Sequence, residues 1–223
     1  GWAATGEAFH QIFKNRTTVG YLVALTFTGA AFFIWLGSSQ PVFDLVYGRA
    51  DQFAVMFSAS GVVAAVGFFS VGWFINRYGA HRVAMTSIGM MLVLNIALVA
   101  LVARGGGGPP FWGWFILLTA SNVFLSMVVP TGLALALRPL GSIAGTAAGV
   151  IGACSMAGSA VLAALVDTRI STTVTPMAVG YLLYGTLALA GVLWARPSGG
   201  GHGGDADSVA GFHADGPTPS SSA

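Results

Sequence analysis

Six long apolar stretches, joined by short links that contain Gly, Pro and Arg, constrain the fold of this 223-residue chain more than any other feature. The stretches cover residues 18–38, 53–75, 83–103, 111–137, 144–166 and 176–195. Each is long enough to cross a membrane, since a helix needs about 20 residues to span about 30 Å of hydrocarbon. Every Asp, Glu, Lys and Arg lies outside them, as the cost of an unpaired charge in lipid demands. The sequence therefore predicts an all-α membrane protein with six transmembrane helices.

The composition excludes several classes of partner. Only 7% of the residues are charged and 55% are hydrophobic, whereas a typical soluble domain has about 25% charged residues. The nine Lys and Arg residues are scattered singly over the links and form no basic patch for a nucleic acid. The single cysteine, Cys154, lies in an apolar stretch and builds neither a disulfide nor a cysteine-based metal site. We predict no metal, no cofactor and no nucleic-acid partner.

The links predict how the chain is divided and oriented. Residues 1–17 are interpreted as a cytoplasmic or interfacial lead-in, 18–195 as the helical bundle and 196–223 as a disordered cytoplasmic tail rich in Gly, Ser, Pro and Asp. Alternating sides place Lys14, Arg16, Arg77, Arg82, Arg138 and Arg196 on one side, and Arg49, Arg104 and Arg169 on the other. The positive-inside rule then predicts a multi-pass protein of the inner (plasma) membrane with both termini in the cytoplasm.

Polar and aromatic residues inside the stretches predict a substrate cavity. Asn122 and Ser126 lie four residues apart, so both face the same side of a helix, and a buried amide there requires a hydrogen-bonding partner or a cavity. Phe32 and Trp35 share a face that suits apolar or cationic ligands, although Trp35 also suits an interfacial anchor. Met156 lies in a glycine-rich stretch whose small residues permit close helix packing. The candidate substrate-binding residues are Phe32, Trp35, Asn122, Ser126 and Met156.

Carboxylates and histidines are absent from the six stretches. None contains Asp, Glu or His, so these residues alone supply no carboxylate for proton coupling within the membrane. The stretches also lack a paired nucleophile, acid or metal cluster of the kind that intramembrane catalysis requires. We therefore predict that the chain is not an enzyme.

The link between the second and third stretches carries a motif of glycines and arginines. Its residues Gly72, Asn76, Arg77, Gly79 and Arg82 follow the spacing Gly-x-x-x-Asp-Arg-x-Gly-x-Arg/Lys-Arg. This pattern resembles the cytoplasmic loop signature of the major facilitator superfamily, in which it belongs to a cytoplasmic gate. Asn76 replaces the aspartate of the family, a departure that fits the commonly degenerate copy in the second half of these transporters.

Further segments resemble the second half of drug-resistance transporters of the Bcr/CflA group. They are residues 37–48, 130–141, 144–147 and 173–176, and the resemblance extends over residues 6–196. It implies a fold of twelve helices in two six-helix halves, each a 3+3 repeat, with transport by alternating access. The chain starts at Gly1 rather than Met, and we expect it to be the C-terminal half. The N-terminal half would then hold the membrane-embedded acidic residues.

The resemblance implies the C-terminal half of a proton-coupled multidrug exporter that carries out drug:H⁺ antiport. The expected partners are the lipid bilayer, protons, a small hydrophobic or cationic drug-like substrate, and either the absent six-helix half or a second copy of the chain. Two alternatives remain open. One is a major facilitator transporter of a sugar, organic acid or other metabolite, and the other is a non-transporting six-helix scaffold or homodimer.

Overall fold

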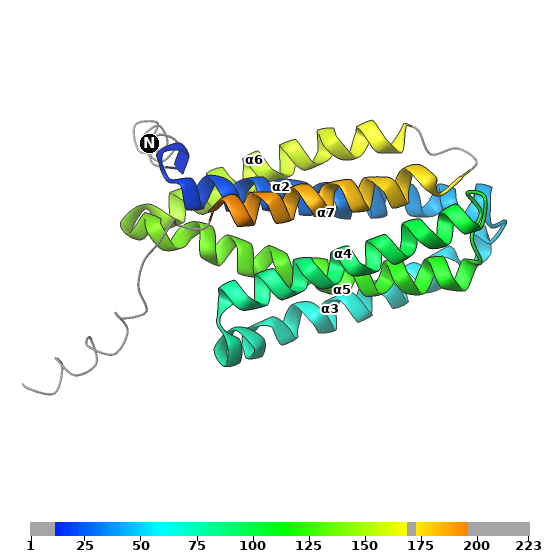
Figure 1. Cartoon of the computed structure of the whole chain (residues 1–223), viewed down its shortest axis with the longest axis horizontal. Helices are drawn as coiled ribbons and strands as arrows, with labels where there is room; N and C mark the ends of the chain where they lie inside the picture. Colours follow the sequence, from blue (N-terminus) through cyan, green and yellow to red (C-terminus); the bar gives the residue numbers. More distant parts are fainter. Residues whose placement is uncertain (1–11, 169–172, 196–223) are drawn as a thin grey trace, which may run out of the picture.

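Six long helices make up the computed structural model, which describes residues 12–168 and 173–195 (Figure 1). In chain order they are α2 (Arg16–Pro41), α3 (Phe53–Tyr78), α4 (Ala80–Arg104), α5 (Phe111–Leu137), α6 (Ala144–Asp167) and α7 (Thr175–Ala195). Short helical turns occupy Val42–Val46, Ala50–Gln52 and Arg138–Ile143. All six helices are long and apolar enough to cross a membrane, and the described residues contain no strand. The predicted all-α, six-helix fold is confirmed. Most of the predicted lead-in and the whole tail lie outside the described residues.

The helices extend beyond the apolar stretches where capping groups allow it. Asn15 caps α2, because its Oδ1 accepts hydrogen bonds from the backbone N–H of Thr17 at 3.0 Å and of Thr18 at 3.4 Å. Helix α2 therefore begins at Arg16, two residues before the predicted start. Gly79, whose φ is +82°, ends α3 and starts α4. The turn within the motif is thus a single residue in a conformation that favours glycine.

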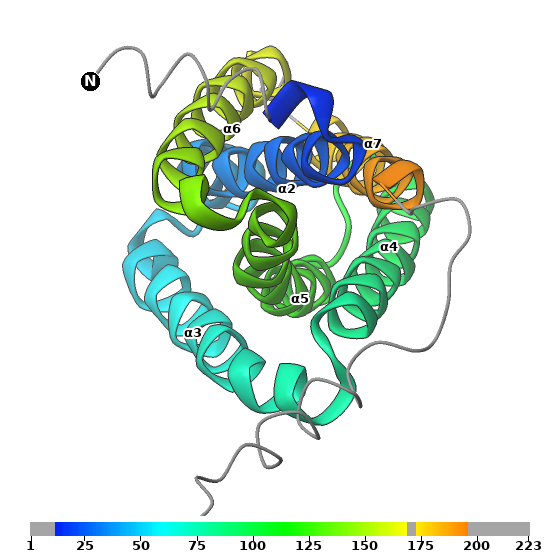
Figure 2. The same ribbon diagram turned by 90° about the vertical axis from the view of Figure 1, so that its left-hand side faces the viewer.

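The helices form a bundle with α2 and α5 in the middle and the other four around them (Figure 2). Helix α2 packs mainly on α7, α6 and α5, and α5 packs on α4 and α3. Helices α3 and α6 are the least buried of the six. In the view along the bundle α3 lies beside α5, and α6 lies beside α2.

Glycines bring α2 and α7 into direct backbone contact. A Cβ placed on Gly20 would lie 2.6 Å from the carbonyl oxygen of Gly191 and 2.5 Å from the Cβ of Ala195. The sequence singled out α6 as the helix whose small residues permit close packing, yet a Cβ on Gly145, Gly149 or Gly152 would meet nothing within 4 Å. Within the described chain, these three glycines have no close neighbour. Helix α6 instead packs closely on α2 further along, where a Cβ on Gly158 would lie 2.8 Å from Cγ2 of Thr26.

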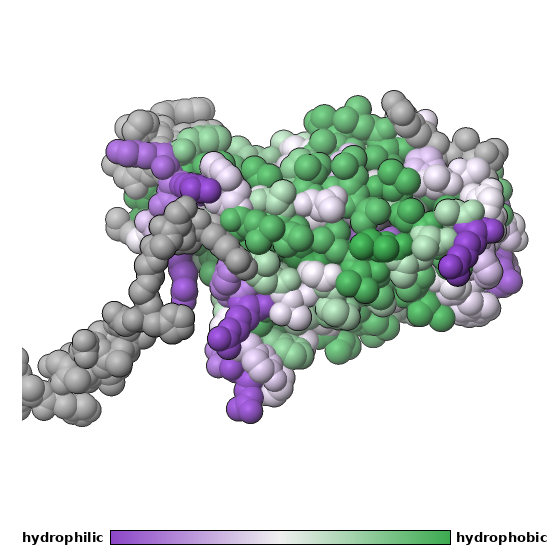
Figure 3. Space-filling model, viewed as in Figure 1, coloured by the Kyte–Doolittle hydropathy of each residue, from purple (hydrophilic) through white to green (hydrophobic). Residues whose placement is uncertain are grey.

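Polar residues gather at the two ends of the bundle. The visible face has a hydrophobic middle, with hydrophilic side chains at both ends (Figure 3). One end carries Gly79 and the turn Arg138–Ile143, and we call it the Gly79 end; the opposite end carries the last turn of α6, and we call it the Asp167 end. This distribution is the one that a bilayer requires of a protein that spans it.

Candidate functional site

All five predicted substrate-binding residues line one cavity of about 500 Å³. Phe32 and Trp35 come from α2, Asn122 and Ser126 from α5, and Met156 from α6, while α3 completes the wall with Phe57, Ser60, Gly61, Ala64 and Phe68. The sequence predicted a cavity from residues of three of these four helices and pointed to no lining residue of α3. Its volume lies in the range of about 300–1,000 Å³ that is typical of small-molecule sites.

Aromatic rings form the part of the wall nearest the Asp167 end. Trp35 stacks on Phe57, with ring centroids 5.7 Å apart and planes inclined by 16°, and its ring lies 6.1 Å from that of Trp114. The side chain of Trp35 is only 4% exposed, so it is a buried element of the cavity wall and not an interfacial anchor. Phe32 is 43% exposed and lies at the edge of the cavity, where it contacts the ring of Phe33. The wall can therefore contact apolar or flat aromatic ligands.

The amide of Asn122 is held by a buried hydrogen-bond network. The hydroxyl of Tyr181 on α7 donates to Asn122 Oδ1 at 3.1 Å. The carbonyl oxygen of Tyr181 accepts from Asn95 Nδ2 at 3.1 Å, and Ser121 Oγ donates to Asn95 Oδ1 at 2.8 Å. Asn122 is 5% exposed, and its Nδ2 has no partner among the described residues. The sequence singled out Asn122, but not the tyrosine from α7 that joins it to Asn95.

The serine hydroxyls of the wall donate to backbone carbonyl oxygens. Ser126 Oγ donates to Ala64 O on α3 at 2.9 Å and to Val123 O at 2.7 Å, so it joins α5 to α3. Ser159 Oγ donates to Thr26 O at 2.7 Å and joins α6 to α2. Because each of these hydroxyls already donates its proton to a backbone oxygen, it can only accept a hydrogen bond from a ligand. Ser60 and Ser155 likewise donate within their own helices.

Met156 lies at the rim of the cavity. Its side chain is 65% exposed, although it comes from the same helix as the buried Ser159. A flexible thioether in this position can adapt to ligands of different shape. Among the described residues that line the cavity, none carries a charge.

Asp167 is a polar residue whose contact the sequence did not predict. It lies one residue beyond the predicted end of its apolar stretch, and the structure includes it in the last turn of α6. Ser38 Oγ on α2 donates a hydrogen bond to its Oδ1. A Cβ on Gly37 would lie only 2.8 Å from Asp167 Oδ2, so the carboxylate lies directly against the backbone of α2. The two partners are 129 residues apart in the sequence, so no local pattern indicates their contact.

The predicted gate motif lies at the Gly79 end, outside the cavity. Asn76, Arg77 and Arg82 are exposed, and none of them pairs with a carboxylate of the described chain. Arg82 lines a second cavity of about 310 Å³ together with Phe74, Tyr78, Val83, Thr86, Ser87, Phe124 and Met127. A Cβ on Gly72 would meet nothing within 4 Å. The structure thus places Asn76, Arg77, Gly79 and Arg82 at or near the turn between α3 and α4, and Gly72 within α3, apart from the substrate-binding candidates.

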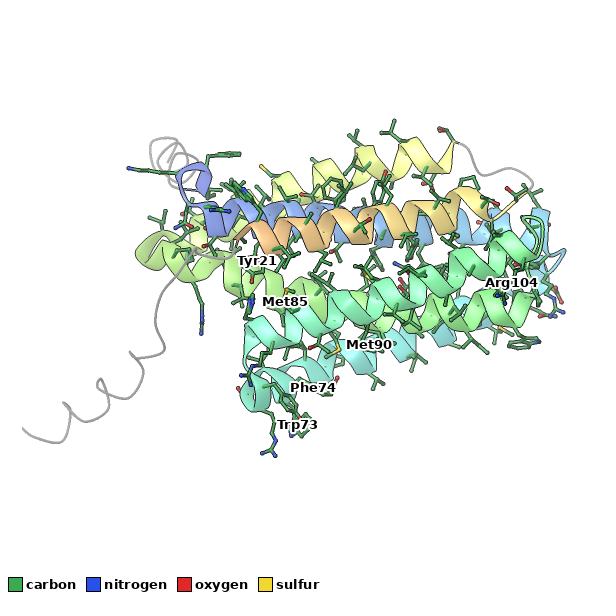
Figure 4. All side chains as sticks on the ribbon, in the orientation of Figure 1. Tyr21, Trp73, Phe74, Met85, Met90 and Arg104 are labelled. Atoms are coloured by element: carbon green, nitrogen blue, oxygen red, sulfur yellow. The ribbon has the colours of Figure 1, made fainter. Side chains whose placement is uncertain are left out.

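A hydrogen bond joins the neighbourhood of the motif to α2. The hydroxyl of Tyr21 lies 3.0 Å from Nδ1 of His81, which follows Gly79 by two residues. Figure 4 shows Tyr21 reaching from α2 toward the first turns of α4, near Met85, while Trp73 and Phe74 mark the end of α3 and Arg104 the opposite end of α4. This contact anchors the start of α4 against the central helix.

Two curated proteins are similar in sequence to the chain. YdgK of Bacillus subtilis, an uncharacterised MFS-type transporter (MFS, major facilitator superfamily), is 24% identical over 192 residues, which cover 83% of this chain and 46% of that protein. A bicyclomycin resistance protein homolog of Haemophilus influenzae is 24% identical over 170 residues, or 76% of this chain and 42% of that protein. No family model and no solved structure gives a significant match.

The chain spans about half the length of the curated relatives that it matches. The similarities support the predicted relationship to the major facilitator superfamily and a role in transmembrane transport. The six-helix architecture is consistent with one half of a fold of that superfamily.

Proposed function

We propose that this chain is the C-terminal half of a drug:H⁺ antiporter of the Bcr/CflA type, which exports small hydrophobic or cationic compounds. The observation that carries the proposal is the cavity of about 500 Å³ between α2, α3, α5 and α6, with its aromatic and aliphatic wall. A wall of this kind suits drug-sized apolar ligands. The similarity to a bicyclomycin resistance protein homolog supports the same substrate class.

The polar groups of the cavity favour drug-like compounds over sugars and organic acids. An organic acid requires a cationic partner, and no described lining residue is charged. A sugar requires many donors and acceptors, but the hydroxyls of Ser126 and Ser159 already donate to the backbone. The proposal therefore places most of the binding energy in apolar and aromatic contact.

Proton coupling is assigned to the other half of the transporter. The acidic residues that the structure describes are Asp44, Asp51 and Asp167, and none of them lines the cavity. A carboxylate that exchanges protons with substrate transport has to face the transport pathway. We place that carboxylate in a second six-helix unit, which closes the open side of the cavity.

Helices α3 and α6 are the proposed contact with this second unit. They flank the cavity, they are the least buried helices, and a Cβ on Gly61, Gly145 or Gly149 would meet nothing within 4 Å. Small residues in membrane helices permit close approach of another helix. The proposed occupant is the N-terminal half, and rocking of the two halves would expose the cavity alternately to each side. We place the Gly79 end in the cytoplasm of a cell whose inner membrane holds the protein.

Dye efflux tests the proposal. Cells that express the full-length gene are loaded with ethidium, and efflux is followed with and without a protonophore, with an empty vector as control. We expect faster efflux upon expression, and we expect the protonophore to abolish the difference. If expression does not change the accumulation of ethidium, drug export is contradicted. If the protonophore does not change the rate of efflux, only the proton coupling is contradicted.

A further inference from the structure

The cavity that Arg82 lines is a groove between α3 and α4 at the Gly79 end, with a volume of about 310 Å³. Only Gly79 joins these two helices, yet each of them packs mainly on α5 and little on the other. They diverge from this turn (Figure 2), and Phe124 and Met127 of α5 line the groove between them. We call this cavity the Arg82 groove.

The Arg82 groove is open to the outside of the described chain. Tyr78, Arg82 and Thr86 line it and are exposed, so a molecule can enter it from the surface of the bundle. The buried residues of its lining are Val83, Ser87 and Met127. The groove shares no lining residue with the cavity proposed for the substrate, so it is a separate site.

The chemistry of the lining changes with depth from the Gly79 end. Arg82 lies in the first turn of α4, and the hydroxyl of Ser87 lies about 7 Å further along the helix. Helix α5 runs in the opposite direction, and its Ser121 is level with Asn95 of α4, to which it donates a hydrogen bond. Phe124 is three residues from this level and Ser87 is eight, which places Phe124 about 7 Å deeper than Ser87. From the Gly79 end inward, the order is therefore a cation, a hydroxyl and an aromatic ring.

Arg82 is a cation without a counter-charge in the described chain. No carboxylate of the described residues pairs with it. The first turn of α4 contains no acidic residue and has no side-chain cap, so the positive end of the helix dipole adds to the charge of Arg82. A guanidinium can donate two parallel hydrogen bonds to a phosphate. The mouth of the groove therefore favours an anionic group and disfavours the cationic compounds proposed for the substrate cavity.

Exposed aromatic residues mark the same end of α3. Trp73 is 62% exposed and Tyr78 is 50% exposed, and their ring centroids lie 6.5 Å apart. Figure 4 shows Trp73 next to Phe74 where α3 ends. Trp and Tyr gather at the interface between membrane and water, at the level of the lipid headgroups. The mouth of the groove thus lies at headgroup level, and its deeper part lies among the acyl chains.

We propose that the Arg82 groove binds an anionic phospholipid of the surrounding membrane. The phosphate of the lipid lies against Arg82, and its ester oxygens reach the hydroxyls of Thr86 and Ser87. One acyl chain packs against Phe124 and Met127. A phospholipid carries these groups in the order in which the groove presents their partners. A zwitterionic lipid fits less well, because no described residue of the lining is acidic and could receive its cationic group. The inference goes beyond the proposed function, since the groove is separate from the substrate cavity.

Selectivity between two lipids with identical acyl chains tests the inference. Dioleoyl phosphatidylglycerol is anionic, and dioleoyl phosphatidylcholine is zwitterionic. The binding of each lipid to the purified protein from the full-length gene is titrated in detergent by native mass spectrometry. The ratio of the two dissociation constants is compared between wild type and variants, so that lipid sites elsewhere on the protein cancel.

Arg82→Gln is expected to lower the preference for phosphatidylglycerol by about fivefold, the effect of one cation near an anionic headgroup. Arg82→Lys keeps the charge and should retain most of the preference. The matched control is Arg104→Gln, which removes the same charge from an exposed position at the opposite end of α4 and should leave the ratio unchanged. An unchanged ratio in Arg82→Gln, or an equal loss in Arg104→Gln, would overturn the inference.

Thr86→Trp tests the place of the acyl chain. The indole would cover the edge of the groove while Arg82 stays in place, and we expect phosphatidylglycerol to bind several-fold more weakly. Glycerol 3-phosphate has the charge of a headgroup but no acyl chain, and it should not displace the lipid at equal concentration. Displacement by glycerol 3-phosphate, or lipid binding to Thr86→Trp as strong as to the wild type, would show an anion site in place of a lipid site. None of these measurements involves transport, so their failure leaves the proposed function intact, and a failure of dye export leaves the lipid site intact.

Discussion

Ser38 on α2 donates a hydrogen bond to the carboxylate of Asp167 on α6, and this contact closes the Asp167 end of the bundle beside the cavity. The backbone at Gly37 leaves room for the carboxylate, since a Cβ there would lie 2.8 Å from Oδ2. Helix α6 otherwise joins the bundle mainly through α2. The pair Ser38 and Asp167 therefore adds a hydrogen bond at one end of the packed contact between α2 and α6, which Ser159 and Thr26 also join.

Asp167→Ala is predicted to destabilise the protein by about 1 kcal/mol, the typical net value of such a hydrogen bond at a partly exposed position. The matched control is Asp44→Ala, which removes an exposed carboxylate from the same end and should change nothing measurable. The midpoint of thermal unfolding is measured for both purified variants and for the wild type in detergent. Equal midpoints for Asp167→Ala and wild type would show that the pair does not stabilise the bundle.

Gly20→Ala is predicted to be strongly destabilising. The added methyl would lie 2.6 Å from the carbonyl oxygen of Gly191, and the backbone atoms of α7 cannot move away as a flexible side chain would. We expect a loss of about 1–3 kcal/mol, as for other overpacked sites. Gly89→Ala on α4 is the matched control, because its methyl would meet nothing within 4 Å. There we expect a gain of up to about 1 kcal/mol from helix propensity. The fraction of protein that stays monodisperse after heating is measured for each variant and compared with that of the wild type.

The sequence was sufficient to predict the six helices, and the five residues that it proposed for substrate binding lie on the wall of one cavity. It succeeded because the length of an apolar helix and the four-residue spacing of Asn122 and Ser126 are local properties. It did not reveal Tyr181 as the partner of Asn122 or Ser38 as the partner of Asp167, since each pair comes from distant segments. It also favoured close packing of the α6 glycines within the bundle, because a pattern of small residues does not indicate which neighbour they face.

The motif at the Gly79 end contains two glycines that are predicted to behave differently. Gly79→Ala forces a residue with a Cβ into φ +82° and should cost about 1–3 kcal/mol, because the turn between α3 and α4 has no other residue to absorb the change. Gly72→Ala falls in the interior of α3 with open space around it and should be neutral or slightly stabilising. The midpoints of thermal unfolding of the two variants are compared with that of the wild type. Equal losses of stability would contradict a special role of Gly79 in the turn.

Phe32→Ala is predicted to reduce dye efflux by about fivefold while leaving stability nearly unchanged. The ring lies at the edge of the cavity and is 43% exposed, so its removal takes apolar contact from a ligand and little from the core. Phe69→Ala provides the control, since Phe69 is 82% exposed and does not line the cavity. Efflux rates are normalised to the amount of protein in the membrane. A similar loss of efflux in both variants would argue against a substrate contact by Phe32.

The last prediction concerns the face of α6 that carries Gly149. Within this chain a Cβ at Gly149 meets nothing within 4 Å, so a large side chain there fits the six-helix bundle itself. If a second six-helix unit packs against this face, Gly149→Phe must push the two units apart, and we expect efflux to fall by about tenfold or more. Gly89→Phe on α4 introduces the same ring at another open glycine, on a helix that does not line the cavity, and should be tolerated. Efflux and thermal unfolding of the full-length protein are measured for both. Normal efflux in Gly149→Phe would show that no helix approaches α6 at this point, because a phenylalanine ring cannot fit between helices whose backbones are in contact.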